Sequence, residues 1–364
     1  MNVSIGIVGL PNVGKSTLFN ALLQKQVAFA ANYPFATIEP NIGVVEVPDE
    51  RLPVLAKIVK SDKIVPAIVE FYDIAGLVKG ASQGEGLGNK FLSHIKEVAA
   101  IVHVVRIFED GNIIHVANKV DAVSDIQTID TELILADLAT LGRQPEPKMN
   151  ASKDQLATYE VIKLLKTKLD EGLPARKVTL DQEQRALIQQ YNLLTMKPVM
   201  YVFNVSEDQL TNAQAIHSKI HDVLKSVNDE TVGFIYLCAK LENEIVDFSS
   251  EEQKEYLNQF NLQETGLNRL IKKAYEILGL MSFLTAGEKE VRAWTIPIGT
   301  MAPQAAAAIH TDFEKHFIKA DIVDYKDFIS ANGWVKAREQ GKVQIVGRDF
   351  VMKDGEVVEF KVGI

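Results

Sequence analysis

Short apolar runs alternate with amphipathic stretches in two separate parts of the chain. Val3–Val8 and Ala67–Tyr72 have the length and composition of buried strands, and Leu18–Leu23 has a helical pattern. Alternation of this kind is typical of an α/β sheet covered by helices. Two further apolar runs, Pro198–Phe203 and Gly233–Leu237, continue the pattern. The sequence therefore predicts one α/β sheet built from both parts, with ligands at the carboxyl ends of its strands.

Residues 131–197 interrupt this pattern with helical periodicity. Between Asp154 and Glu171, one face carries the apolar residues Ile162, Leu165 and Leu169. Thr179 and Gln182 have the spacing of a capping box ahead of a second helix. Two amphipathic helices joined by a short loop predict an antiparallel hairpin. The residues alone allow this hairpin either to cover the sheet or to project from it.

The C-terminal region, residues 281–364, has a different pattern. Val291–Ile298 predicts a strand, and Pro303–Phe317 predicts a helix that starts at a proline. Val343–Phe350 and Val351–Val362 contain short strands separated by turn residues. A strand, a helix and then a hairpin are consistent with a ubiquitin-like β-grasp domain.

Length and composition agree with a chain of several soluble domains. The 364 residues divide into residues 1–130 with 198–280, residues 131–197, and residues 281–364. The net charge of −9 gives no overall attraction to nucleic acid or acidic lipid. Cys238 is the single cysteine, so the chain forms no internal disulfide, as in a reducing compartment. With no signal-peptide pattern and no run of about 18 apolar residues, we expect a cytoplasmic protein without a membrane span.

The segment Gly9–Thr17, GLPNVGKST, carries the first chemistry. It matches G-x-x-x-x-G-K-S/T between a predicted strand and a predicted helix, the context that a P-loop requires. Glycine-rich backbone and the helix N-terminus hold phosphates, Lys15 reaches the β- and γ-phosphates, and Ser16 ligates Mg²⁺. The expected phosphate-binding residues are Asn12, Val13, Gly14, Lys15, Ser16 and Thr17.

Three later residues complete a γ-phosphate-sensing switch. Asp73 follows a strand and is placed to hold Mg²⁺, while the Gly76 amide faces the γ-phosphate. Thr37, in an earlier proline-containing loop, supplies the partner hydroxyl. The predicted metal ligands are therefore Ser16, Thr37 and Asp73, and Lys15, Thr37 and Gly76 are predicted to act in catalysis.

Two segments compete for recognition of the base. Guanine is normally bound by N-K-x-D, and Asn118–Asp121 matches this pattern literally. The order of elements argues against it, because a second base-binding loop should follow one strand–helix unit later. Cys238–Lys240 resembles that second loop but lies far beyond Asn118, whereas it lies one unit after Asn204.

Long stretches of the sequence resemble the Obg-like ATPase family, in its YchF branch. The resemblance covers nearly the whole chain, including Phe283–Trp294 and the segments GLPNVGKST, NYPFATIEPNIGVVEVPDERL, DIAGLVKGAS, GEGLGNKFLSHI, HVVRIFED, TELILADL and APQAAAAIHTDFEKHFI. It implies a P-loop domain of the TRAFAC class, a helical coiled-coil insertion at residues 131–197 that projects as an arm, and a C-terminal TGS domain.

The resemblance also implies that the base is bound by N-x-x-E, here Asn204–Glu207. Adenine presents an amino donor beside a ring-nitrogen acceptor, so a carboxylate suited to guanine's two donors would face a lone pair. A longer acidic side chain, without the usual lysine, removes the guanine fit. We expect ATP over GTP, with Asn204, the Val205 backbone, Glu207, Cys238 and Ala239 around the base.

The usual water-orienting glutamine is absent, because Leu77 occupies its position. Slow hydrolysis is therefore expected, assisted by another side chain, a monovalent cation such as K⁺, or a partner. His115 is the leading candidate side chain, with His94 and His103 as further candidates.

The predicted partners follow from the resemblance alone. It implies ribosome association through the large subunit, with RNA contact and no DNA specificity, and we expect a monomer. Two functions remain open: an ATPase switch that controls a translation partner, or a nucleotide-gated RNA- or ribosome-binding module.

Overall fold

The computed structural model describes residues 3–30, 41–74, 87–110, 119–148 and 150–363. The chain divides into two compact units. The first comprises Met1–Val44 and Glu70–Leu270, and the second comprises Val45–Val69 and Ile271–Ile364.

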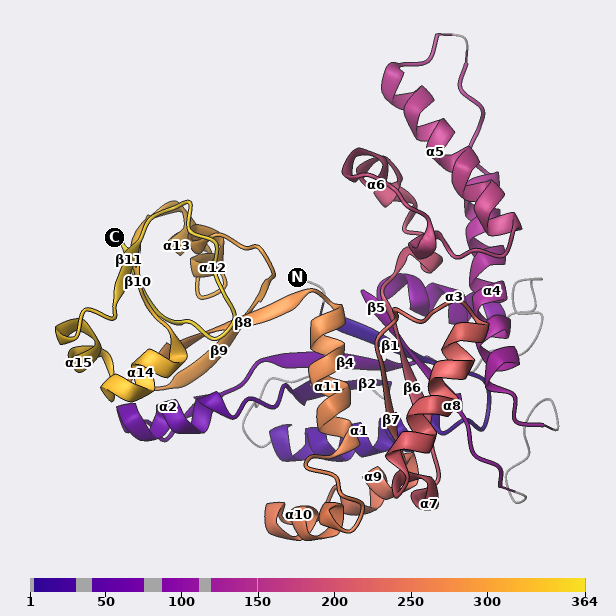
Figure 1. The fold of residues 1–364 in the computed structure, drawn as a ribbon. Helices are drawn as coiled ribbons and strands as arrows, with labels where there is room; N and C mark the ends of the chain where they lie inside the picture. The colour runs from indigo at the N-terminus through magenta and orange to yellow at the C-terminus, as the bar shows by residue number, and fades with distance from the viewer. Residues whose placement is uncertain (1–2, 31–40, 75–86, 111–118, 149, 364) are drawn as a thin grey trace. The chain divides into compact units, whose positions relative to one another are not determined.

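Strands in the order β2-β4-β1-β5-β6-β7 form the sheet of the first unit (Figure 1). Their bounds are β1 (Ser4–Val8), β2 (Ile42–Glu46), β4 (Ile68–Asp73), β5 (Ala100–Arg106), β6 (Val199–Asn204) and β7 (Phe234–Leu237). The pairs from β4 across to β7 are all parallel. All residues of β5 are buried, because this central strand is covered on both faces. The predicted α/β sheet, with its two chain segments, is confirmed.

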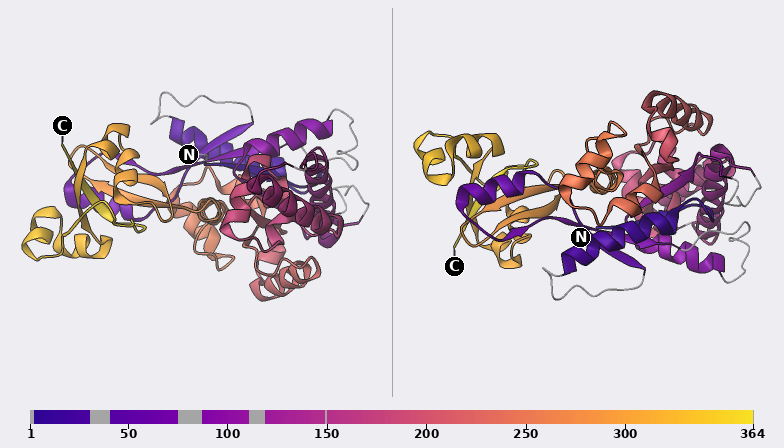
Figure 2. Two further views of the ribbon diagram at one scale, coloured as in Figure 1. Left: turned by 90° about the horizontal axis from the view of Figure 1, so that it is seen from above. Right: turned by 90° about the horizontal axis from the view of Figure 1, so that it is seen from below.

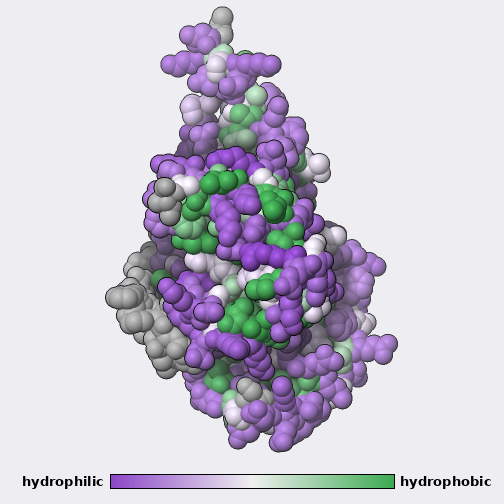
Figure 3. Space-filling view, turned by 90° about the vertical axis from the view of Figure 1, so that its left-hand side faces the viewer, coloured by the Kyte–Doolittle hydropathy of each residue, from purple (hydrophilic) through white to green (hydrophobic). Residues whose placement is uncertain are grey.

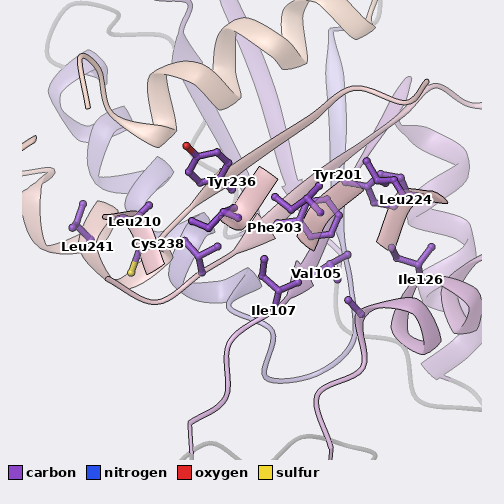
Figure 4. Packing of buried hydrophobic residues seen from close by; sticks show 14 of the residues in the cluster. Val105, Ile107, Ile126, Tyr201, Phe203, Leu210, Leu224, Tyr236, Cys238 and Leu241 are labelled. Carbon is purple, nitrogen blue, oxygen red and sulfur yellow. The ribbon is translucent and has the colours of Figure 1, made fainter. Parts of the chain in front are cut away.

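Helices lie on both faces of this sheet (Figures 1 and 2). They are α1 (Lys15–Ala30), α3 (Leu87–Glu97), α4 (Ala122–Gly142), α7 (Glu207–Leu210), α8 (Ala213–Ser226), α9 (Ala239–Ile245), α10 (Ser250–Asn258) and α11 (Gly266–Ile277). One core cluster joins β5, β6 and β7 to α4, α8 and α9 (Figure 4). Tyr201 and Phe203 of β6 are fully buried in it, packed with Ile220 of α8.

The helical insertion has a hydrophobic core of its own. It comprises α5 (Lys153–Asp170), α6 (Gln182–Ile188) and the short 3₁₀ helices Ala175–Lys177, Gln189–Tyr191 and Leu194–Met196. The predicted face of Ile162, Leu165 and Leu169 is buried there together with part of α4. Figure 1 shows α5 extending away from the sheet. The capping box forms at Asp181 and Gln184, so the prediction of Thr179 and Gln182 is wrong by two residues.

The second unit is built on a sheet with the strand order β11-β10-β12-β8-β9-β3. Its strands are β3 (Ile64–Val65), β8 (Leu280–Ala286), β9 (Val291–Pro297), β10 (Phe317–Val323), β11 (Gln344–Val346) and β12 (Val357–Val362). Strands β8 and β9 form an antiparallel pair, and β12 runs parallel to β8. This is the strand arrangement expected of a β-grasp domain.

The helices of the second unit are short. They are α2 (Arg51–Val59), α12 (Ala302–Ala307), α13 (Thr311–Lys315), α14 (Tyr325–Ala331) and α15 (Trp334–Glu339). The single helix predicted over Pro303–Phe317 is divided, because His310 is extended and its side chain accepts a hydrogen bond from the Asp312 amide at the start of α13. Phe317 already belongs to β10.

The domain expected at residues 1–130 differs from the structure over Val45–Val69, which belongs to the second unit. Strand β3 in this segment pairs in parallel with β9. The Arg51 guanidinium forms an ion pair with Asp354 at 2.7 Å. These contacts join positions that are distant in sequence, so no local pattern predicts them.

On the described surface of the face in Figure 3, apolar residues form small areas separated by polar ones, not one broad patch. None of the helices within the described ranges is long and apolar enough to cross a membrane.

Candidate nucleotide-binding site

The P-loop connects β1 to α1 through backbone conformations that glycine and asparagine tolerate best. Gly14 has a φ of +101° and Asn12 a φ of +61°. A side chain at Gly14 would also overlap the amide of Asn204. The loop therefore turns its backbone at the N-terminus of α1, where amide groups can bind an anion.

Lys15 is the first residue of α1, and its side chain reaches back to the loop before the helix. Its ammonium donates a hydrogen bond to the Leu10 carbonyl at 2.7 Å. Burial lowers the pKa of Lys15 to about 8, although nearby Asp73 opposes this shift. Burial likewise raises the pKa of Asp73, opposed by Lys15. The two groups therefore interact at the ends of β1 and β4, where phosphates and a cation are expected.

The described donors fit a magnesium ion. Ser16 is exposed in the first turn of α1, and Asp73 ends β4; both offer the hard oxygen ligands that Mg²⁺ prefers. No three His, Cys, Asp or Glu side chains gather as a metal site in the described part of the chain. A Mg²⁺ ion held mainly by phosphates and water needs no such group. Thr37 and Gly76 lie outside the described residues.

A pocket of about 600 Å³ opens beside the P-loop. Its lining consists of Asn12, Gly14, Thr17, Phe108, Glu109, Asp110, Asn204, Val205, Ser206, Glu207, Asp208, Cys238, Ala239 and Lys240. The structure thus gathers, at the carboxyl ends of β5, β6 and β7, the segments predicted to surround the base. Val13, Lys15, Ser16 and Asp73 are not in this lining.

Asn204 joins the P-loop to the base-side loops. Its side-chain amide donates to the Val13 carbonyl at 2.9 Å, and its side-chain oxygen accepts from the Ala239 amide at 3.0 Å. Asn204 is only 5% exposed. The β6 end, the P-loop and the start of α9 are therefore held at fixed separations by one side chain.

Glu207 begins α7 at the rim of this pocket. Its carboxylate lies 3.3 Å from the ammonium of Lys240, so the two loops that follow β6 and β7 are paired across the pocket. The neighbouring Ser206 caps the helix. The amide of Val205 donates to the Leu237 carbonyl at 2.9 Å, which fixes the backbone of this residue in the pocket lining.

Cys238 borders the pocket but belongs to the core. It packs beside Leu210 and Leu241 in the cluster of Figure 4. Burial raises the pKa of its thiol, so the thiolate is disfavoured. The side chain acts in packing, as a small apolar residue would.

The alternative guanine-binding segment is only partly described. Asn118 and His115 lie outside the described residues. The Asp121 carboxylate caps α4 by accepting a hydrogen bond from the Ser124 amide at 3.1 Å, and Asp121 is not in the pocket lining. His103 is buried in β5 beside the Tyr201 ring, and His94 is exposed on α3.

No motif predicts the third part of the lining, Phe108–Asp110. This segment follows β5 directly, and the register pairs Arg106 of β5 with Asn204 of β6. The mostly apolar run Ala100–Arg106 indicates a strand that ends there, but not that the residues after it line a pocket.

Comparisons with known proteins agree with this architecture. Residues 4–136 match a family model described as a 50S ribosome-binding GTPase, and residues 280–363 match the C-terminal YchF-GTPase model, described as a protein of unknown function. The ribosome-binding ATPase YchF of Bacillus subtilis is 48% identical over 368 residues, which cover both chains completely. That of Escherichia coli O157:H7 is 48% identical over 99% of each chain.

A solved structure gives the same result. The YchF GTPase of Schizosaccharomyces pombe superposes with a TM-score of 0.88 at 37% identity, covering 99% of this chain and 98% of that one. The chain belongs to the YchF family. The names of its relatives differ in the nucleotide, since some YchF proteins are called ATPases and another a GTPase. These names therefore leave the preferred nucleotide of this YchF chain to be inferred from the residues of its pocket.

Proposed function

We propose that this chain is a Mg²⁺-dependent ATPase that binds and hydrolyses ATP in preference to GTP and associates with the ribosome. The observation that carries this proposal is the position of Asn204, which bonds both the P-loop and the α9 amide. It supports a position of the segment Val205–Glu207, which lines the pocket, beside the base. Valine and glutamate stand there in place of the lysine and aspartate that bind guanine.

The phosphate side supports nucleotide hydrolysis. Lys15 and the amides of the P-loop neutralise charge on a triphosphate, and Mg²⁺ supplies further charge neutralisation and orientation when it is bound. Ser16 and Asp73 would hold that ion together with Thr37. The roles of Thr37, Gly76 and His115, and a contribution of K⁺, stay predictions.

The hydrogen-bonding groups of the base side favour adenine. The backbone carbonyl of Val205, a residue of the pocket lining, suits the amino group of adenine, whereas it would face the O6 acceptor of guanine. Glu207, which also pairs with the exposed Lys240, carries its carboxylate one methylene further out than the aspartate that binds the two guanine donors. A site that leaves buried polar groups unpaired with the wrong base discriminates against that base. The other candidate carboxylate, Asp121, caps α4.

The ribosome would control this activity. The curated relatives are named ribosome-binding ATPases, which supports the same association here and a cytoplasmic location. We propose that the helical arm at residues 131–197 and a C-terminal TGS domain contact this partner. The large subunit, through RNA, is the proposed binding surface, and the chain acts as a monomer.

Steady-state phosphate release tests the proposal. We expect Mg²⁺-dependent hydrolysis of ATP that is slow alone and faster with purified ribosomes. Hydrolysis of GTP at an equal or higher rate would favour the guanine alternative. Ribosome binding that is the same with ATP, with ADP and without nucleotide would instead indicate a passive binding module.

A further inference from the structure

The interior of the first unit contains an arginine next to the nucleotide pocket. Arg106 ends β5 and is the largest fully buried side chain among the described residues, with an exposed fraction of 1%. Arginine is seldom buried to this degree without a specific partner. The position of Arg106 opposite Asn204 in the β5–β6 register places it directly behind the pocket wall.

Three contacts connect this guanidinium to the segment Phe108–Asp110, which forms one wall of the pocket. Its Nε donates to the Phe108 carbonyl at 3.0 Å, and one Nη donates to the Asp110 carbonyl at 3.4 Å. The guanidinium carbon also lies 4.5 Å from the centre of the Phe108 ring, within the range of a cation–π interaction. Arg106 thus binds the backbone carbonyls at both ends of Phe108–Asp110 and packs on the Phe108 ring.

Two further contacts hold the start of this segment. The Ile107 amide donates to the Asn204 carbonyl at 3.1 Å, and Lys219 of α8 donates to the Ile107 carbonyl at 2.8 Å. The segment leaves the sheet at Ile107, so beyond this residue the hydrogen bonds between β5 and β6 no longer hold it. From Phe108 onward, where the segment lines the pocket, the hydrogen bonds of Arg106 hold the backbone instead.

We propose that Arg106 is a positioning residue that holds the Phe108 wall against the purine base of the bound nucleotide. The inference rests on the proposed function, because it takes the pocket to hold a base. A planar guanidinium presents donors in a fixed fork and can pack on a ring at the same time. It therefore fixes both the path of the wall and the orientation of the ring, without contacting the nucleotide.

The role predicts a selective effect on binding. Replacing Arg106 releases the wall on the base side, while the P-loop contacts to the phosphates remain. We expect affinity for ATP to fall by about five- to tenfold, with no change in affinity for inorganic tripolyphosphate, which has no base. KM for ATP rises accordingly, and kcat stays near that of the unchanged protein.

The experiment compares Arg106→Lys and Arg106→Met in the full chain by titration with Mg²⁺–ATP and Mg²⁺–tripolyphosphate. Lysine retains the charge but not the fork, so it should lose less affinity than methionine. Arg269→Lys is the matched control, because Arg269 also donates to a carbonyl and packs on a ring, both of Tyr236, outside the pocket lining. That variant should bind both ligands normally.

A second variant protects the test against a folding defect. Phe108→Leu removes the ring and keeps Arg106, and it should reproduce the selective loss of ATP binding. Equal losses for ATP and tripolyphosphate, or no loss for either, would overturn the proposal. A wild-type preference for GTP would refute the proposed function alone, since the same comparison between GTP and tripolyphosphate still tests Arg106.

Discussion

The two sides of the nucleotide pocket are built in different ways. The phosphate side comes from one continuous segment, Gly9–Thr17, with Asp73 from the neighbouring strand. The base side is assembled from three loops that follow β5, β6 and β7 and are far apart in the sequence. A continuous motif fixes its own geometry, whereas an assembled wall depends on the sheet that brings its parts together. Triphosphate binding is therefore a local property, and the choice of base is a tertiary one.

Asn204 is where the two sides meet. Its side chain donates to the Val13 carbonyl of the P-loop and accepts from the Ala239 amide at the start of α9. A substitution on the phosphate side should therefore leave base selectivity unchanged, and one on the base side should leave phosphate binding unchanged. Asn204 is the exception. The following predictions test that division, from the largest expected effect to the smallest.

Lys15→Ala should remove the phosphate side alone. We expect hydrolysis to fall on the order of 10²–10³-fold, because a buried cation that stabilises the transferred phosphoryl group is lost. ATP, GTP and tripolyphosphate should lose affinity by the same factor in parallel titrations. A loss confined to one base would show that the two sides are not separable.

Asn204→Ala should damage both sides. It leaves the Val13 carbonyl and the Ala239 amide without their partner, which costs about 2 kcal/mol of the free energy of unfolding. Urea denaturation measures this loss, and binding of ATP and tripolyphosphate should weaken together. Asn212→Ala, which removes the cap of α8, is a control of the same residue type: it should lower stability and leave both affinities unchanged.

Lowering the pH should reduce the free energy of unfolding of the unit that contains both sides of the pocket. Burial lowers the pKa of His103 to about 3, below its ordinary value near 6.5 in an unfolded chain. The unfolded state therefore takes up a proton first as the pH falls below about 6.5, and the folded state loses stability until about pH 3. Between pH 7 and pH 5 this one group accounts for a loss of about 2 kcal/mol.

Urea denaturation at the two pH values isolates the His103 contribution. His103→Phe should flatten the pH dependence by that amount, whereas His221→Gln, at an exposed position on α8, should leave it unchanged. An unaltered slope in the His103 variant would show that this side chain does not remain neutral in the folded protein.

Changing the base side alone should alter only selectivity. The double variant Val205→Lys, Glu207→Asp restores the guanine-binding residue types, and the ratio of ATP to GTP affinity should shift toward GTP by about tenfold. Glu244→Gln is the matched control, because Glu244 also pairs with Lys240 but lies outside the pocket lining. A shift of equal size in both variants would assign selectivity to Lys240 charge rather than to the base-binding segment.

Local signals predicted much of this molecule. The P-loop, the strands around it and the buried face of α5 were all evident from periodicity and spacing, because each depends on residues close in sequence. The capping box at Asp181 was misplaced because Thr179–Gln182 satisfies the same four-residue pattern. Short patterns recur by chance, and only packing selects between them.

Contacts between distant segments could not be predicted. Val45–Val69 joins the second unit through β3 and Arg51, whose partners lie hundreds of residues away. The wall at Phe108–Asp110 likewise becomes part of a pocket only because β5 lies between β1 and β6. At the literal match Asn118–Asp121, the described part has a structural role, since the Asp121 carboxylate caps α4.

Competition binding tests the central claim most directly. The full chain, with Mg²⁺ and a labelled ATP analogue, is titrated with unlabelled ATP and unlabelled GTP. ATP should displace the label at a concentration about tenfold or more below that of GTP, because we propose that valine and glutamate at positions 205 and 207 suit adenine better than guanine. Displacement by GTP at an equal or lower concentration would contradict the account.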